Sequence, residues 1–353
     1  MLDVSVILLS DNYASTAIGP IEVFHSAGLL WNTLNGTRPN PRFRVTIASP
    51  DGDTVSSPYA LRLVPQVPLR KVRHADIVIV PASGLDLDAQ LARNAQLLPW
   101  LRRKAAQGAH IAGICTGVAY LAAAGLLDGR EATTHWAVAS QFRQRYPKVD
   151  WHPEKFITED RRMFCSGGVY ASMDLSLYLV EKFCGHEVAL QCAKALLINM
   201  PRLSQSGYAT LPLSRPHNDE KVRAAEHYLE KNYAEDVSLE LLAQDLGMSP
   251  RNFSRRFKRA TGRLPGNYLQ GLRVAIAKEM LEDGARSVQV VSAAVGYEDA
   301  AFFRGLFKRS TGMTPGEYRE NFAGSHGATG RSLGATVGRR RAVSVAPARL
   351  ASA

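Results

Sequence analysis

Apolar and polar positions follow two different patterns in the two parts of this chain. From residue 1 to about residue 199, short continuous apolar runs alternate with helix-like stretches. Apolar strands separated by helices are typical of a mostly parallel sheet covered on both faces, so this part predicts an α/β domain over residues 1–199. The predicted strands are Val4–Leu9, Phe43–Ala48, Asp76–Val80 and His110–Ile114, and the predicted helices are Ile18–Leu30, Asp88–Ala106, Val118–Ala124 and Met173–Phe183.

The pattern changes after residue 199. Residues 200–218 are rich in Pro, Ser and Gly and have no periodicity, which predicts a linker between domains. Residues 219–322 show helical periods and no convincing strand. Residues 323–353 are rich in Gly, Ala and Ser and carry the basic cluster Arg339–Arg341, which predicts a disordered basic tail. Such a tail is either a solvated extension or an additional contact to DNA phosphates.

The helical part contains an internal repeat. The segment FSRRFKRATGRLPGNY, which starts at Phe253, recurs as FRGLFKRSTGMTPGEY from Phe303. A short amphipathic helix precedes each copy and ends at a glycine, Gly247 in the first unit and Gly296 in the second. A helix, a glycine-containing turn and a second helix form the helix-turn-helix motif, so the repeat predicts an all-α tandem helix-turn-helix domain.

The first unit carries the residue types that read DNA. Ser249 is suited to cap the second helix and Pro250 to occupy its first position. If Phe253 and Phe257 are anchored in the core, the basic and polar side chains beside them face outward, at the helix start that enters the major groove. A solvated basic helix face is the alternative. The predicted DNA contacts of this unit are Arg251, Asn252, Ser254, Arg255, Lys258 and Arg259.

The second unit has fewer groups that could hydrogen-bond to bases. Arg304 is the one side chain of this unit that is well suited to hydrogen-bond to bases. We therefore expect the second unit to depend more on phosphate and van der Waals contacts. Its predicted DNA contacts are Ala301, Arg304, Lys308 and Arg309. The helix-prone segment Asn267–Glu282 would hold the two units rigidly, so that they enter adjacent major grooves ~34 Å apart.

Both units and their spacing resemble the AraC/XylS-type DNA-binding domain over residues 219–322. The matching stretches are LAQDLGMSPRNFSRRFKRATGRLPGNYLQGLR and AAVGYEDAAFFRGLFKRSTGMTPGEYR. The resemblance implies sequence-specific binding to double-stranded promoter DNA and control of transcription. It further implies activation through contact with RNA polymerase as the more common outcome.

In the α/β part, a cysteine follows an apolar strand directly. The stretch HIAGICTGVAYL places Cys115 between Gly113 and Gly117, which allow a sharp turn from strand to helix. A thiol at a helix N-terminus is expected to have a lowered pKa, and His135 could approach it in space. These residues therefore raise the hypothesis of a cysteine nucleophile.

The same stretch, together with CSGGVYASMDLSLYLVEKF, resembles the ThiJ/PfpI superfamily over residues 3–198. The resemblance implies the flavodoxin-like fold shared with class I glutamine amidotransferases, and, with the appended reader, the homodimeric arrangement of GlxA-type regulators. Enzymes of the superfamily use the elbow cysteine with a nearby acid. Here Thr16 stands where that acid is expected, and Ser83-Gly84 follows Pro81-Ala82 where a glycine pair is common. We therefore expect no catalytic residues and a degenerate active site.

A ligand site is the better interpretation of this region. Open α/β sheets bind ligands at the carboxyl ends of their strands, where Ser10 and Asp11 are also expected. A structural histidine, a core tryptophan and a capping threonine are the alternatives for His135, Trp136 and Thr116. The resemblance implies nitrogenous metabolites such as amino acids or betaines as effectors. The predicted ligand-binding residues are Thr16, Ser83, Gly84, Cys115, Thr116, His135 and Trp136.

Composition limits the remaining possibilities. A net charge of +11 favours a polyanionic partner. The four cysteines have no metal-binding spacing, so neither a metal nor a cofactor is predicted. The chain shows no signal peptide and no apolar run of ~20 residues, which predicts a cytoplasmic protein without a membrane partner.

Two other functions stay open at this point. One is a cysteine-dependent amidase or hydrolase with an appended DNA-binding module, and the other is an architectural DNA binder that responds to no ligand. The sequence does not select the effector, the operator, the regulated genes or the direction of control.

Overall fold

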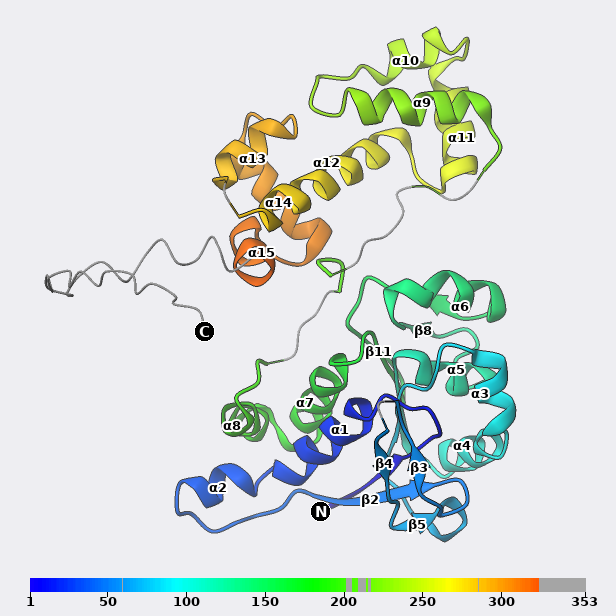
Figure 1. Ribbon diagram of the computed structural model, residues 1–353, viewed down its shortest axis with the longest axis vertical. Helices are drawn as coiled ribbons and strands as arrows, with labels where there is room; N and C mark the ends of the chain where they lie inside the picture. Colours follow the sequence, from blue (N-terminus) through cyan, green and yellow to red (C-terminus); the bar gives the residue numbers. More distant parts are fainter. Residues whose placement is uncertain (59, 201–204, 209–213, 215–216, 285, 324–353) are drawn as a thin grey trace, which may run out of the picture.

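The computed structural model describes residues 1–58, 60–200, 205–208, 214, 217–284 and 286–323. Its first part is a seven-stranded sheet with helices on both faces, which confirms the α/β flavodoxin-like fold (Figure 1). The strand order is β10-β11-β7-β6-β1-β2-β5, and every pair is parallel except β10 with β11. These strands are β1 (Leu2–Ile7), β2 (Phe43–Ser49), β5 (Val67–Pro68), β6 (Ile77–Val80), β7 (His110–Ile114), β10 (Ile157–Asp160) and β11 (Met163–Ser166).

The sheet has a separate hydrophobic core on each face, because neighbouring side chains along a strand point to opposite faces. In β6, Ile77 and Ile79 join one core while Val78 and Val80 join the other. The continuous apolar runs in the sequence therefore mark strands that are buried on both sides. Two further pairs of short strands lie outside this sheet: β3 (Val55–Ser56) with β4 (Arg62–Leu63), and β8 (Glu131–Ala132) with β9 (Asp150–Trp151).

The helices divide between the two faces, with α1, α7 and α8 on one side and α3, α4 and α5 on the other (Figure 1). The predicted single helices Ile18–Leu30 and Asp88–Ala106 are wrong in one respect, because each is interrupted. The second breaks at Asn94, the C-cap of α3, whose backbone N–H and side-chain amide both donate to the carbonyl oxygen of Gln90. The helices of this part are α1 (Ser15–Ser26), α2 (Leu30–Leu34), α3 (Leu87–Arg93), α4 (Leu97–Ala106), α5 (Val118–Ala123), α6 (Ala139–Arg145), α7 (Ala171–Cys184) and α8 (His186–Leu196).

From residue 217 to residue 323 the described chain is helical and contains no strand, as predicted. Among the described residues, no helix combines the length and the apolarity that crossing a membrane would require. The predicted basic tail over residues 323–353 lies outside the described residues except for Ala323, the C-cap of α15. The helices are α9 (Glu220–Lys231), α10 (Leu239–Asp245), α11 (Pro250–Thr261), α12 (Pro265–Glu282), α13 (Val288–Ala294), α14 (Ala300–Thr311) and α15 (Pro315–Phe322).

The sequence repeat is a repeat in structure. In the first unit, the rings of Phe257 and Tyr268 meet edge to face, with centroids 5.3 Å apart and an interplanar angle of 79°. The corresponding rings of Phe307 and Tyr318 are 5.5 Å apart at 81°. Gly262, which ends α11, and Gly312, which ends α14, both have positive φ, at 85° and 81°. The two copies therefore fold by the same contacts and not merely by similar composition.

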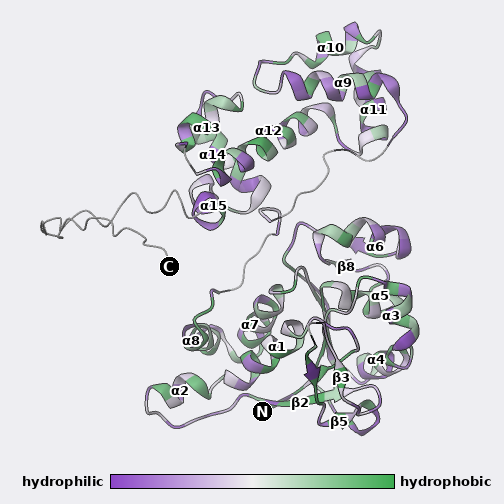
Figure 2. Ribbon diagram, in the orientation of Figure 1, coloured by the Kyte–Doolittle hydropathy of each residue, from purple (hydrophilic) through white to green (hydrophobic). Residues whose placement is uncertain are grey.

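Helix α12 belongs to the cores of both units. Leu269 and Leu272 near its start pack in the first core, whereas Ala277 and Leu281 near its end pack in the second. Figure 2 shows hydrophobic residues along α12, in contrast to the mostly hydrophilic α9. Because one continuous helix is buried at both ends, it fixes the spacing of the two units.

Two neighbouring phenylalanines of α14 allow a test of the second core. Phe303 is 0% exposed and Phe302 is 50% exposed. We expect Phe303→Ala to lower the free energy of unfolding of the helical part by ~3–5 kcal/mol, because it removes a fully buried ring. The matched variant Phe302→Ala should lower it by less than ~1 kcal/mol. Urea unfolding followed by circular dichroism measures both, and equal losses would contradict this description of the core.

Candidate DNA interface and ligand site

The first candidate DNA-reading helix is α11, and it begins as predicted. The Ser249 hydroxyl accepts the N–H of Asn252, and Pro250 occupies the first turn. Phe253 and Phe257 are buried and face the core. The six predicted contacts of this unit lie on the other side of the helix, where Arg251, Arg255, Lys258 and Arg259 are exposed and Asn252 and Ser254 are half-buried.

The arginines of α11 do not all have the same role. Arg256 donates through Nε to Asp219 Oδ2 at 2.6 Å, and Asp219 also caps α9. This pair stabilises the unit internally, so Arg256 is not a candidate for base contact. Arg255 donates to Asn252 Oδ1 at 3.2 Å on the exposed face. That hydrogen bond orients the Arg255 side chain along the exposed face near the start of α11.

The second reading helix, α14, is less basic at its start. Asp299 accepts the N–H groups of Ala301 and Phe302, at 2.7 and 3.2 Å, which places a carboxylate beside the predicted contact Ala301. Arg304, Lys308 and Arg309 are exposed on the outer face, as predicted. Sequence reasoning missed Phe302, whose half-exposed ring takes the position of Asn252 in the repeat. The alignment of the two copies contained this signal, and an exposed ring there is suited to contact a thymine methyl group.

The two units are also joined by one arginine on α12. Arg273 donates to the carbonyl oxygens of Tyr233 and Glu235 in the first unit, at 2.6 and 2.8 Å. Its guanidinium also lies 4.9 Å from the ring centroid of Tyr297 in the second unit. This residue was not singled out from the sequence, because its partners are separated from it by up to 40 positions.

At the candidate ligand site, Cys115 occupies a sharp turn between β7 and α5. Its φ of 54° lies in the left-handed region, which is unfavourable for a residue with a Cβ atom. A Cβ atom at Gly117 would lie only 2.2 Å from the carbonyl oxygen of Pro81, so a glycine is required there. The sequence motif therefore predicted the elbow correctly.

Two predicted ligand-binding threonines hold the loop that follows β6. Thr16 accepts the N–H of Ala82 at 3.1 Å and donates to the carbonyl oxygen of Tyr13. Thr116 accepts the N–H of Ser83 at 3.0 Å and donates to the carbonyl oxygen of the same residue. Both hydroxyl groups are thus engaged with backbone, and they fix the loop in place at the carboxyl end of the sheet.

The expected activation of Cys115 is wrong. The thiol is 6% exposed, and burial raises its pKa to about 11, although a hydrogen bond from the Thr116 backbone acts in the opposite direction. Among the described residues, Cys115 and His135 share no hydrogen bond; the His135 ring accepts the N–H of Ala137 instead. Burial also lowers the pKa of His135, which favours the neutral form of its ring. The ring stacks obliquely on Trp136, with centroids 5.3 Å apart.

Three polar groups at this edge of the sheet were not predicted. Asn12 Nδ2, Ser166 Oγ and Ser172 Oγ are buried without a hydrogen-bond partner among the described residues. Asp11 accepts from Arg93 and Gln90 of α3, and the predicted residue Gly84 lies beside Gln90. Unpaired buried polar groups are costly, so Ser166, which is paired in register with Ile114 next to Cys115, is a further candidate for ligand contact.

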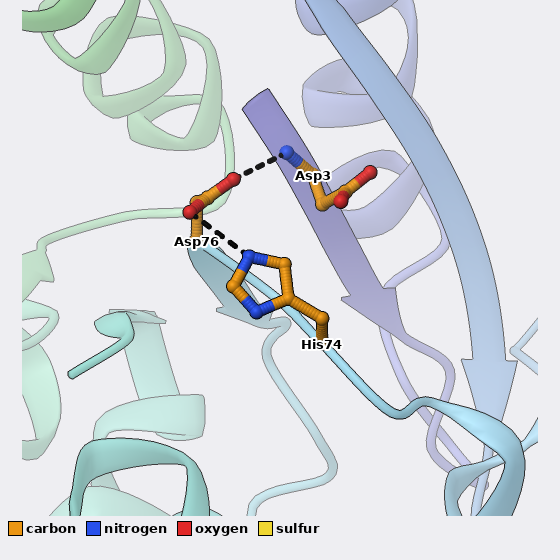
Figure 3. Close-up of side chains that lie close together, drawn as sticks. All are labelled: Asp3, His74 and Asp76. Carbon is orange, nitrogen blue, oxygen red and sulfur yellow. Dashed lines mark hydrogen bonds and ion pairs between the residues drawn. The ribbon is translucent and has the colours of Figure 1, made fainter. Parts of the chain in front are cut away.

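A cluster of two carboxylates and an imidazole lies at the opposite end of the sheet. Figure 3 shows Asp76 accepting the N–H of Asp3 and contacting the ring of His74. Asp3 itself is paired with Arg44, which lowers the pKa of its carboxyl group. Both carboxylates of this cluster thus already accept hydrogen bonds from protein donors.

The chain matches two family models. Residues 5–182 match the DJ-1/PfpI family, and residues 242–321 match the helix-turn-helix domain family. These matches agree with the fold classes described above for both parts of the chain.

Three curated relatives are similar over most of this chain. It is 28% identical over 278 residues to the HTH-type transcriptional regulator CdhR of Pseudomonas aeruginosa, covering 78% of this chain and 82% of that protein. It is 30% identical over 252 residues to the regulator ArgR of the same species, covering 71% and 72%. It is 28% identical over 284 residues to the regulator GlxA of Rhizobium meliloti, covering 79% and 86%.

The pKa of Cys115 leads to a prediction about its reactivity. With a pKa of about 11, about one thiol in a thousand is ionised at pH 8. We therefore expect iodoacetamide to modify Cys115 more slowly than the half-exposed Cys184 at pH 8, which mass spectrometry of tryptic peptides measures. Cys184 serves as the internal control. Preferential modification of Cys115 at neutral pH would contradict this assignment and support an active nucleophile.

Proposed function

Because this chain belongs to the DJ-1/PfpI family and also carries a helix-turn-helix domain, we propose that it is a DNA-binding transcription regulator of the GlxA type, controlled by a small molecule. The observation that carries the proposal is the duplicated helix-turn-helix unit. In each copy, buried aromatic residues anchor one side of a capped helix, so that the basic side chains on its other side face outward. The net charge of +11 agrees with a polyanionic partner.

The proposed DNA contacts are the predicted residues of α11 and α14, with Phe302 added. In α11, Arg251 and Arg255 would contact bases, while Lys258 and Arg259 would contact phosphates. In α14, Arg304 would hydrogen-bond to bases, and Phe302 would make an apolar contact with them. The first unit therefore carries most of the sequence specificity, since Asp299 places negative charge at the start of α14.

The proposed effector site is the carboxyl end of the sheet, with residues 1–199 as the sensor domain and residues 219–322 as the reader. His135 and Trp136 are half-buried and adjacent, and the buried hydroxyl groups of Ser166 and Ser172 have no hydrogen-bond partner in the described part of the chain. An aromatic ring beside polar groups suits a small metabolite with a cationic nitrogen, such as an amino acid or a betaine. The homodimer and the contact with RNA polymerase that the GlxA-type arrangement implies belong to this proposal as well.

Non-catalytic function is part of the same proposal. A buried thiol with a raised pKa, no acid at position 16 and a histidine engaged with backbone all disfavour a cysteine-dependent amidase.

Two variants on one face of α11 separate base reading from phosphate contact. We expect Arg255→Ala to reduce discrimination between operator and random duplex by about 1–3 kcal/mol, because a bidentate base contact is lost. Lys258→Ala should weaken binding to both duplexes similarly and reduce the salt slope, d log K/d log[salt], by about 1. The operator is first selected from the chain's own promoter region, and fluorescence anisotropy at several salt concentrations gives both quantities. Unchanged discrimination in Arg255→Ala would contradict the assignment of α11.

Effector binding can be tested with the full chain. We expect one class among amino acids, betaines and polyamines to raise the melting temperature of the first part of the protein. Trp136→Ala should abolish this shift, whereas Trp31→Ala, a change far along the chain on α2, should preserve it. A screen in which no metabolite of these classes produces a shift would contradict the proposed effector class.

A further inference from the structure

A short turn between the two domains makes contacts with both. Residues 205–208 are described within a segment that the sequence predicted to be a linker, and in Figure 1 they lie between the sheet part and α15. The backbone N–H of Gln205 donates to the carbonyl oxygen of Glu154, and the N–H of Tyr208 donates to the carbonyl oxygen of Gln205. The turn is therefore anchored and is not a free connection.

The side chain of Gln205 is inserted into the sensor domain and is 2% exposed. Its Nε2 atom lies 2.9 Å from the carbonyl oxygen of Thr134, 3.1 Å from that of Lys155 and 3.2 Å from Thr133 Oγ1. We call these three oxygens the acceptor cluster. Thr133 Oγ1 itself donates to the carbonyl oxygen of Lys155 at 2.9 Å, which leaves its lone pairs for Gln205.

The chain leaves space for this carboxamide by having a glycine beside it. A Cβ atom at Gly167 would lie 2.6 Å from Gln205 Oε1 and 2.9 Å from Nε2. At the neighbouring Gly168, a Cβ atom would meet the His135 ring at ordinary contact distances, 3.4 Å from Cδ2 and 3.7 Å from Nε2. The acceptor cluster surrounds the two N–H bonds of the carboxamide, and the backbone of Gly167 lies close against it. Together they form a site for a primary amide group, which in this protein is supplied by Gln205.

Tyr208 extends the contact from the sensor to the reader. Its ring packs edge to face on Phe156 of the sensor, with centroids 5.6 Å apart, and on Phe322 of α15, with centroids 5.0 Å apart. Phe322 packs in turn on Tyr318, which belongs to the core of the second unit. Gly207 also faces this unit, because a Cβ atom there would lie 2.7 Å from Met313 Cε.

From these contacts we propose that residues 205–208 are a latch, in which the Gln205 carboxamide fills an amide site on the sensor and Tyr208 thereby holds the second helix-turn-helix unit against it. The latch acts on the second unit, because Tyr208 packs on Phe322 of α15 and Gly207 lies close to Met313 and to the carbonyl oxygen of Thr311. All of these contacts lie within the chain, so the latch does not depend on DNA binding.

The amide site also lies beside the candidate effector site. Thr134 donates to the carbonyl oxygen of Cys115 at 2.9 Å, and His135 follows it directly. A molecule bound at His135 and Trp136 would therefore shift residues that line the amide site. Such a shift would weaken or strengthen the hydrogen bonds of Gln205 and with them the latch. This last link rests on the proposed function, whereas the latch itself does not.

The amide site is tested by chemical rescue of Gln205→Ala in the full chain. This variant removes the carboxamide and leaves the acceptor cluster without its donor. We expect propionamide to raise the melting temperature of Gln205→Ala in a saturable way and to leave that of the wild type unchanged. Propionate has the same shape without the N–H donors and should produce no such shift. An equal effect of both compounds, an equal effect on the wild type, or no effect at all would overturn the amide site.

The coupling between domains is tested by hydrogen exchange in the same protein. In Gln205→Ala we expect amide exchange to become about tenfold faster at residues 133–135 and also at residues 313–322, and propionamide to restore the first segment. Gly167→Ala, which leaves no room for Gln205, should reproduce both changes, while Gly168→Ala should reproduce neither. Tyr208→Ala should accelerate exchange at residues 313–322 alone. If residues 313–322 exchange at the wild-type rate in Gln205→Ala and Tyr208→Ala, the latch is wrong.

Discussion

The helical part of this protein depends on the burial of one helix in two cores. The start of α12 packs on the aromatic pair of the first unit, and its end packs on the pair of the second. A reader with two recognition helices needs a fixed spacing between them, because successive major grooves are separated by a fixed distance. Arg273 adds a fixed orientation, since it binds carbonyl oxygens of one unit and faces a ring of the other. The two units thus act as one body, although each has a core of its own.

The α/β domain keeps the cysteine turn of its family in a surrounding that does not activate the thiol. Cys115 has a positive φ in the turn, and Pro81 lies so close to Gly117 that a Cβ atom would not fit there. However, the thiol is buried, and the position where the superfamily's enzymes carry an acid is Thr16, whose hydroxyl binds backbone of the adjacent loop. The turn therefore serves to position loops around the end of the sheet. The effector site that we propose there would use buried hydroxyl groups beside the half-buried rings of His135 and Trp136.

A regulator of this type needs a physical connection between the site that senses and the helices that read. Flexible linkers transmit little, because a mobile chain can absorb any displacement. Here the connecting segment contains a buried polar side chain and an aromatic ring that contacts both domains. A carboxamide is a suitable anchor for a reversible contact, since its hydrogen bonds are satisfied when it is bound and can be satisfied by water when it is released.

The sequence by itself determined the features that depend on local patterns. Apolar runs marked the strands of the doubly covered sheet, and the recurring Phe, Gly and Pro positions marked both helix-turn-helix units and the cap of the first recognition helix. Features that depend on contacts between distant positions were decided only by the tertiary structure. The pKa of Cys115 is raised by burial, which its position at a helix N-terminus did not predict. Arg256 forms an ion pair with Asp219 inside the first unit, and Asp299 caps α14; the charge pattern along the chain showed neither role. Likewise, Gln205 looked like an ordinary linker residue, because its partners Thr133, Thr134 and Lys155 lie 50 to 72 positions away along the chain.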